Sequence, residues 1–308
     1  MPVQTQDDSP SATLWILWSV SSSINGSPLD QSKSGGALRR PRTFLRLLAI
    51  IAGVYIAWCG LLFTVQDSLV YLPGLAGKPL PDRLIPAGVQ RVWVEPEGAV
   101  RVEGWLWVPP GGPAPLVVLM HGNAELIDHC TDNAEAWLRR GYAVLLPEYR
   151  GYGRSGGNPG QDAILADVLA MLALAREHPG VASGPIVLHG RSLGTGIAAQ
   201  VAARLQESPR AMVLESPFTS IASFAWKYGV PPALVRNPYR TDQVLPTLTC
   251  PILILHSRHD EVVPFAHGER LASLNPGARL VELSGSHNAG LSLQPGYWRA
   301  IDEFLSGP

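Results

Sequence analysis

The sequence has little cysteine, little lysine and almost no net charge. The three cysteines among its 308 residues, Cys59, Cys130 and Cys250, form no C-x-x-C pair, and no histidine cluster has the spacing of a zinc site. We therefore predict no metal and no cofactor, and a Cys130–Cys250 disulfide would need an oxidising compartment. The formal net charge of −1 argues against nucleic acid as a partner, because phosphate binding needs a basic surface.

The first 43 residues have no sustained hydrophobic periodicity. They are rich in serine, glycine, proline and glutamine, so we predict a disordered tail over residues 1–43. The apolar stretch 14–18 is too short to cross a bilayer and has no basic helical face for surface binding.

An uncharged run from Leu47 to Val65 follows a cluster of arginines at positions 39–46. Nineteen helical residues span about 28 Å, close to the roughly 30 Å of a bilayer core. A buried core helix would have a polar face, which this run lacks. A cleaved signal peptide is the main alternative, but its apolar region is usually shorter and a small-residue cleavage site is missing. We predict an uncleaved transmembrane signal anchor over residues 44–65.

The arginines before the anchor predict its orientation. Because positive residues stay inside, the N-terminus is expected inside and the remainder outside, which gives a single-pass membrane protein with an extracytoplasmic catalytic domain. A lipoprotein attachment at Cys59 is disfavoured because the bulky Trp58 precedes it.

A Gly/Pro-rich linker over residues 66–88 leads into a domain over residues 89–308. Segments 89–94 and 100–108 alternate as a β-hairpin does. Short apolar strands then alternate with helices. The predicted strands are 116–120, 143–146, 186–188, 211–214, 252–255 and 280–283. The predicted helices are 127–140, 162–177, one from the turn after residue 188 to about 205, and 297–305. This order predicts an α/β fold, with a mostly parallel sheet covered by helices on both faces.

The pentapeptide Gly190-Arg191-Ser192-Leu193-Gly194 lies between a predicted strand and a helix. A serine at the tip of such a turn is the G-x-S-x-G nucleophile elbow, in which the glycines allow close backbone packing. Gly-rich turns between strands and helices are also common without catalysis. The rest of the chain has to supply the partners of Ser192.

A serine nucleophile needs a base and a group that orients the base. The topology requires the acid and then the histidine downstream of the serine, each after a strand. We predict His287 as the base and Asp260 as the acid, with Glu261 as the alternative, since residue type alone does not choose between neighbours. The other histidines near these strands, His189, His256 and His259, are predicted to be structural.

The oxyanion intermediate needs two N–H donors. We assign one to the backbone of Leu193 at a helix N-terminus and one to the backbone of Asn123, which follows Gly122. An ordinary turn at the end of the strand is the alternative for the second donor.

Together, His121-Gly122-Asn123, the elbow, Asp260 and His287 resemble the α/β-hydrolase superfamily over about residues 90–308. The loop 147–156 is similar to one typical of that superfamily, and we assign it no catalytic role. The anchor and the segment 66–73 resemble an N-terminally anchored branch related to serine aminopeptidase-like and acyl-protein-thioesterase-like members. The resemblance implies an eight-stranded-type sheet with a short cap.

Residues 215–250 have the place of the cap. Its aromatic residues either contact an acyl group or pack on the sheet; they are Phe218, Phe224, Trp226, Tyr228 and Tyr239. We predict a membrane-anchored serine hydrolase that cleaves small-molecule or acyl carboxylic esters or thioesters through an acyl-enzyme. One alternative is a serine aminopeptidase or amidase, for which Glu215 is the nearby acid in the sequence that would hold a substrate ammonium. The other is a non-catalytic module, against which the complete triad argues. The sequence indicates no particular protein partner.

Overall fold

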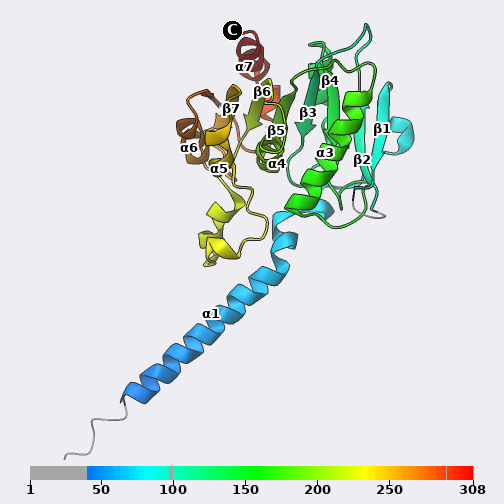
Figure 1. Ribbon diagram of the computed structural model, residues 1–308. Coiled ribbons are helices and arrows are strands. Elements are labelled where there is room, and N and C mark those ends of the chain that lie inside the picture. The colour runs from blue at the N-terminus through cyan, green and yellow to red at the C-terminus, as the bar shows by residue number, and fades with distance from the viewer. Residues whose placement is uncertain (1–39, 97–99, 289, 308) are drawn as a thin grey trace, which may run out of the picture. The chain divides into compact units, whose positions relative to one another are not determined.

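The computed structural model describes residues 40–96, 100–288 and 290–307 (Figure 1). The chain divides into two compact units, residues 1–53 and 54–308. Residues 1–39 of the predicted disordered tail lie outside the described residues.

The first helix, α1, spans Arg40–Val70. Proline at position 41 is tolerated because it lies in the first turn, where its missing N–H has no helical acceptor. By length and composition α1 is able to cross a membrane. The helix starts before the predicted anchor and ends after it, because residues 66–70 continue its hydrogen bonding. Two 3₁₀ turns, η1 (Pro73–Leu75) and η2 (Asp82–Leu84), follow in the predicted linker.

One sheet of eight strands organises residues 89–283, in the order β1-β2-β4-β3-β5-β6-β7-β8. The strands are β1 (Val89–Val94), β2 (Val102–Trp107), β3 (Leu116–Met120), β4 (Ala143–Pro147), β5 (Val187–Arg191), β6 (Ala211–Glu215), β7 (Ile252–Ser257) and β8 (Ala278–Leu283). β2 pairs antiparallel with β1 and β4, and all other pairs are parallel. The predicted α/β class, the opening hairpin and the mostly parallel sheet are confirmed.

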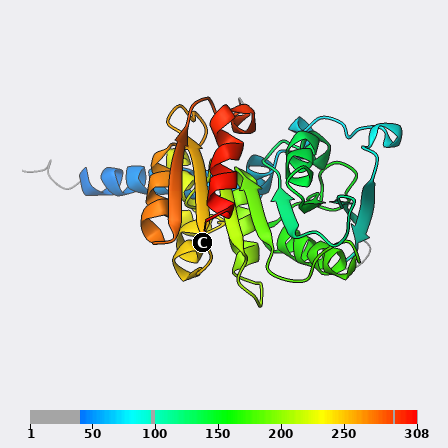
Figure 2. The same ribbon diagram turned by 90° about the horizontal axis from the view of Figure 1, so that it is seen from above.

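Alternate residues of the central strands face two separate cores. Leu116 and Val118 of β3 belong to one core, and Val117 between them belongs to the other. The first core contains residues of α3, α4 and α6, and the second contains residues of α2 and α7. The helices after α1 are α2 (Thr131–Leu138), α3 (Gln161–Glu177), α4 (Leu193–Ala202), α5 (Thr241–Val244), α6 (Ala266–Leu274) and α7 (Pro295–Leu305). Figure 2 shows α7 beside the β7–β8 end of the sheet.

Several element boundaries differ from the prediction. The predicted helix 127–140 is divided into η3 (Ile127–His129) and α2, and α4 ends before residue 205. β5 extends to Arg191 because it continues to pair with β6 as far as Glu215. The last two residues of β5, Gly190 and Arg191, are therefore the first two residues of the elbow. Between β6 and β7 the cap consists of the 3₁₀ helices η4 (Ile221–Tyr228), η5 (Pro232–Leu234) and η6 (Leu245–Thr247), with α5 among them.

Candidate active site

Ser192 lies between the end of β5 and the first residue of α4. Its φ of 48° is in the left-handed region, which costs an L-residue about 1–2 kcal/mol. Two glycines make this turn feasible. A Cβ at Gly190 would overlap the Gly194 carbonyl, and a Cβ at Gly194 would overlap the Met120 carbonyl of β3. The tight packing holds the Ser192 hydroxyl at the carboxyl edge of the sheet, where it remains partly exposed.

The structure brings Ser192, His287 and Asp260 together. His287 Nε2 lies 3.0 Å from Ser192 Oγ, and His287 Nδ1 lies 2.8 Å from Asp260 Oδ2. Because a carboxylate only accepts hydrogen bonds, the proton of neutral His287 belongs on Nδ1. Nε2 is then the acceptor for the Ser192 hydroxyl, which is the arrangement a general base requires.

Asp260 is held by more than His287. Its Oδ1 accepts the backbone N–H groups of Val262 and Val263, at 3.0 and 2.7 Å. His256 Nε2 lies 3.3 Å from Asp260 Oδ2 and donates to the Val263 carbonyl at 2.9 Å. Burial raises the pKa of Asp260, but the hydrogen bonds from His256 and His287, with the backbone N–H of Val263, outweigh it and lower the pKa well below the usual value. Asp260 therefore stays ionised beside His287.

Glu261, the alternative acid, does not contact the imidazole through a hydrogen bond. Its Oε2 accepts the backbone N–H of His287 at 3.1 Å, and the residue is exposed. Of the two neighbouring carboxylates, only Asp260 reaches His287 Nδ1.

One expected oxyanion donor belongs to the elbow itself, and the other belongs to the loop after β3. Leu193 is the first residue of α4, so its N–H belongs to the unpaired first turn. The side chain of Asn123 is engaged elsewhere: its Nδ2 donates to the Val70 carbonyl at 2.7 Å, and its Oδ1 accepts the Tyr152 hydroxyl at 2.7 Å. The Gly122 N–H donates to Glu125 at 2.6 Å and the Ala124 N–H donates to Asn123 Oδ1 at 3.0 Å, so the Asn123 N–H stays the expected donor of this loop.

Arg191 links three loops of the site, a role that the sequence analysis missed. Its guanidinium forms an ion pair with Glu125, lies 3.2 Å from Glu215 Oε1 and donates to the His287 carbonyl at 2.9 Å. We call residues 121–125, after β3, the oxyanion loop, because the expected donor Asn123 lies in it. Since Glu125 also binds the Gly122 N–H, Arg191 connects this loop to the loop that carries His287. The only sequence signal for this role is a charged residue at the variable position of the elbow.

A chain of hydrogen bonds leads from Glu215 into the core. Its Oε2 accepts the Tyr297 hydroxyl at 2.7 Å, and that hydroxyl lies 2.9 Å from His189 Nε2. His189 Nδ1 accepts the Trp137 indole N–H at 3.0 Å, so Nε2 carries the proton and the ring is neutral. Burial lowers the pKa of His189 to about 3. Burial also raises the pKa of Glu215, and the Arg191 guanidinium opposes that rise.

His121, at the start of the oxyanion loop, is held by the loop after β4. Its Nε2 lies 2.8 Å from Glu148 Oε1, and the Tyr149 ring stacks on it at 3.9 Å between centroids. The Tyr149 hydroxyl donates to the His121 carbonyl at 2.8 Å. Residues 147–156 thus fix the backbone before Asn123 through contacts within the core.

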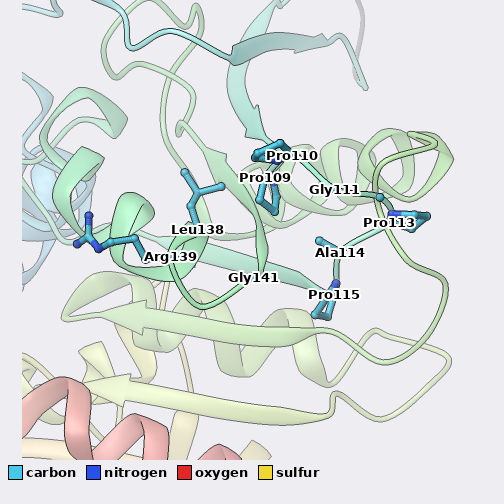
Figure 3. A pocket seen from close by; sticks show the side chains of 10 residues that line it. Pro109, Pro110, Gly111, Pro113, Ala114, Pro115, Leu138, Arg139 and Gly141 are labelled. Atoms are coloured by element: carbon cyan, nitrogen blue, oxygen red, sulfur yellow. The ribbon is translucent and has the colours of Figure 1, made fainter.

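The described residues hold no metal-binding cluster, and a hollow away from the triad contains no catalytic side chain. The described residues contain no group of three or more histidine, cysteine or acidic side chains placed to hold a metal, and all three cysteines are free thiols. A shallow hollow of about 410 Å³ lies at the amino edge of the sheet (Figure 3). It is lined by Pro109–Pro115, Leu138, Arg139 and Gly141, which include no nucleophile and no general base.

The mostly parallel sheet, the strained serine elbow and the neighbouring histidine and carboxylate place the chain among α/β-type hydrolases. The comparisons agree. The sequence profile of the serine aminopeptidase S33 family matches residues 111–236. An uncharacterised protein of Mycobacterium tuberculosis is 32% identical over 258 residues, 82% of this chain and 90% of that protein.

Two further similarities point the same way. The lysophosphatidylserine lipase ABHD12 of Danio rerio is 28% identical over 289 residues, 79% of this chain and 74% of that protein. The solved structure of ferulic-acid-bound Est1E from Butyrivibrio proteoclasticus superposes with a TM-score of 0.59 at 21% identity, over 70% of this chain and 97% of that one. The chain belongs to the α/β-hydrolase superfamily and is an esterase- or lipase-like hydrolase.

Proposed function

We propose that this protein is a membrane-anchored serine hydrolase that cleaves carboxylic esters or thioesters through an acyl-enzyme. The hydrogen-bonded sequence Ser192–His287–Asp260 carries the proposal, because it joins a strained, partly exposed hydroxyl to a base with a fixed tautomer. The names of the relatives, which include a lipase and esterases, support the same reaction class.

The residues have the following roles in the proposed reaction. Ser192 Oγ attacks the substrate carbonyl carbon while His287 Nε2 accepts the hydroxyl proton. The backbone N–H groups of Asn123 and Leu193 stabilise the oxyanion, and the Asp260 carboxylate stabilises the imidazolium. The intermediate collapses by expelling the alcohol or thiol, which takes the proton from His287. Water then attacks the acyl-enzyme by the same steps and releases the acid.

The acidic residues near Ser192 favour an ester or thioester over a peptide with a free N-terminus. An aminopeptidase would hold the substrate ammonium with a carboxylate at the site. Glu215 is buried and bonded to Arg191 and Tyr297, and Glu125 is bonded to Arg191 and the Gly122 N–H. Both carboxylates therefore already share the Arg191 guanidinium and accept hydrogen bonds from groups of the protein.

The membrane anchor belongs to the same proposal. Within the described part of the chain, α1 is the one helix with the length and composition of a membrane span. The arginines before it predict that residues 66–308 face away from the cytoplasm. A reporter fused after residue 308 is expected to be active only outside the cytoplasm, and activity inside it would overturn this orientation.

Activity-based labelling tests the proposed chemistry. The full chain, purified in detergent, is expected to hydrolyse p-nitrophenyl esters and to be labelled at Ser192 by a fluorophosphonate. A panel of matched ester, thioester and amide substrates then ranks the leaving groups, with the amide expected to be slowest. A folded chain that reacts with neither the ester nor the fluorophosphonate would refute the proposal.

A further inference from the structure

The cap carries large apolar side chains on its outer surface. Trp226 and Tyr228 of η4 are 64% and 55% exposed, and Leu234 of η5 is also exposed. Phe218 and Tyr239, by contrast, are buried beside Gly196 of α4. We call Trp226, Tyr228 and Leu234 the cap face. Lys227 is the only charged residue between positions 221 and 235, so this surface has little polar character of its own.

The backbone of the cap face is hydrogen-bonded to the C-terminal half of α1. The Trp58 indole donates to the Tyr228 carbonyl at 3.0 Å. Gln66 Nε2 donates to the Leu234 carbonyl at 3.2 Å, and Gln66 Oε1 accepts the Arg236 N–H at 2.7 Å. The cap therefore runs alongside α1 between residues 58 and 66.

The position of these contacts along α1 gives the depth of the cap face. Trp58 lies inside the uncharged run 47–65, whereas Asp67 is the first acid after it and binds Arg236 at 2.8 Å. At 1.5 Å per residue, Trp58 lies about 12 Å along the axis from Gln66. If the uncharged run crosses the bilayer, Tyr228 lies closer to the bilayer centre than the Asp67–Arg236 pair does. This position corresponds to the depth of about 5–10 Å to which interfacial segments enter the boundary between head groups and acyl chains.

We infer that the cap face is a second membrane contact, inserted in the lipid interface beside α1; this rests on the proposed anchoring. Its composition suits that environment, because tryptophan and tyrosine favour the interface and a single lysine extends its amine to the head groups. The side chain of Asn123 is bonded to the Val70 carbonyl, so the loop after β3, at the carboxyl edge of the sheet, contacts the same end of α1 as the cap does. The partner of this surface is a lipid leaflet.

Depth-dependent quenching tests this inference on the full chain in phosphatidylcholine vesicles. The three native cysteines, all buried, are replaced by alanine, and one new cysteine is labelled with an environment-sensitive fluorophore. Trp226→Cys and Leu234→Cys report on the cap face. Leu174→Cys is the matched control, since Leu174 is exposed near the end of α3, and the bridge between Val181 and Ala114 places that end at the opposite edge of the sheet. Each labelled chain must unfold at the same temperature as the unlabelled one.

Labels at positions 226 and 234 are expected to lose fluorescence several-fold to spin-labelled lipids and to resist aqueous iodide, while the label at 174 behaves in the opposite way. Iodide quenching at all three positions would overturn the inference. Protection from both quenchers at 226 and 234 would also overturn it, because it would indicate a protein partner. Ile56→Cys separates the two proposals. If position 56 is quenched by lipid and the cap is not, only this inference fails; if position 56 is not quenched, the anchor fails and the inference fails with it.

Discussion

The two edges of the same sheet differ in the chemistry they carry. The carboxyl edge brings together a serine, a histidine and ionised side chains on loops after β3, β5, β6, β7 and β8. The hollow at the amino edge is lined by prolines, glycines and Arg139, which pairs with Glu135 on its own helix. In a parallel sheet the carboxyl ends of the strands face the N-termini of the helices, where unpaired N–H groups favour negative charge. The comparison indicates that topology, and not the presence of a cavity, brings the proposed catalytic side chains together.

The largest effect is expected at the nucleophile. Ser192→Ala should lower kcat by about 10⁴-fold or more, because no hydroxyl remains for His287 to activate. Ser216 is the matched control: it directly follows β6, next to the elbow, and has a similar φ of 50°, but its buried hydroxyl has no partner among the described residues. Ser216→Ala should keep its activity and fluorophosphonate labelling. Loss of labelling in Ser216→Ala alone would move the nucleophile to the residue after β6.

The next effect separates the two neighbouring acids. Asp260→Asn should lower kcat by about 10⁴-fold, because an amide at this position favours the wrong tautomer of His287. Glu261→Gln should stay within about tenfold of the original rate, since its side-chain carbonyl still accepts the His287 N–H. Steady-state rates with a soluble ester measure both. The reverse ranking would show that Glu261 orients the base.

Arg191 tests whether the loops of the carboxyl edge act as one unit. Arg191→Met should lower kcat by about 10–100-fold with a smaller change in KM, because the oxyanion and His287 loops lose their common partner. It also leaves Glu215 buried without its guanidinium, so the pH profile of kcat should shift as well. Glu125→Gln is the milder companion and should give a partial loss. An effect on unfolding temperature alone, with kcat unchanged, would assign Arg191 a purely structural role.

We expect the free energy of unfolding to depend on pH because of His189, which is buried beneath the site. Its pKa falls to about 3 on burial, so the unfolded chain binds a proton at a higher pH than the folded chain does. The contribution of His189 to the free energy of unfolding is complete above the unfolded pKa of about 6.5. As the pH falls towards 3, the free energy of unfolding decreases by about 1.4 kcal/mol per pH unit. Over this range the free energy of unfolding of His189→Gln should decline less steeply than that of the original chain. Parallel curves would contradict the lowered pKa.

The smallest effect is expected at the amino edge. Arg139→Ala should change stability by less than about 0.5 kcal/mol and leave kcat and KM unchanged, because its exposed pair with Glu135 contributes little. A clear loss of activity would show that the hollow communicates with the site and would weaken the contrast between the two edges.

Local patterns along the chain determined much of this protein. Short apolar runs separated by helical segments predicted the parallel sheet, because strands buried on both faces need no alternation. The elbow was visible for a similar reason, since only glycine fits where backbones meet at positions 190 and 194. The chain order of serine, acid and histidine followed from the strand order. The predicted catalytic roles and the limits of the anchor, tail and linker await experiment.

Only the tertiary structure decided which side chains meet. Asp260 and Glu261 are adjacent in sequence, and the turn before Val262 directs the first to the imidazole and the second to a backbone N–H. The contacts of Arg191 with Glu125 and with the His287 carbonyl bridge 66 and 96 residues, separations at which sequence periodicity carries no information. The aromatic residues of the cap were also sorted by packing: Phe218 and Tyr239 are buried beside α4, while Trp226 is exposed. A residue's type limits the partners it accepts, but packing in three dimensions brings one of them within reach.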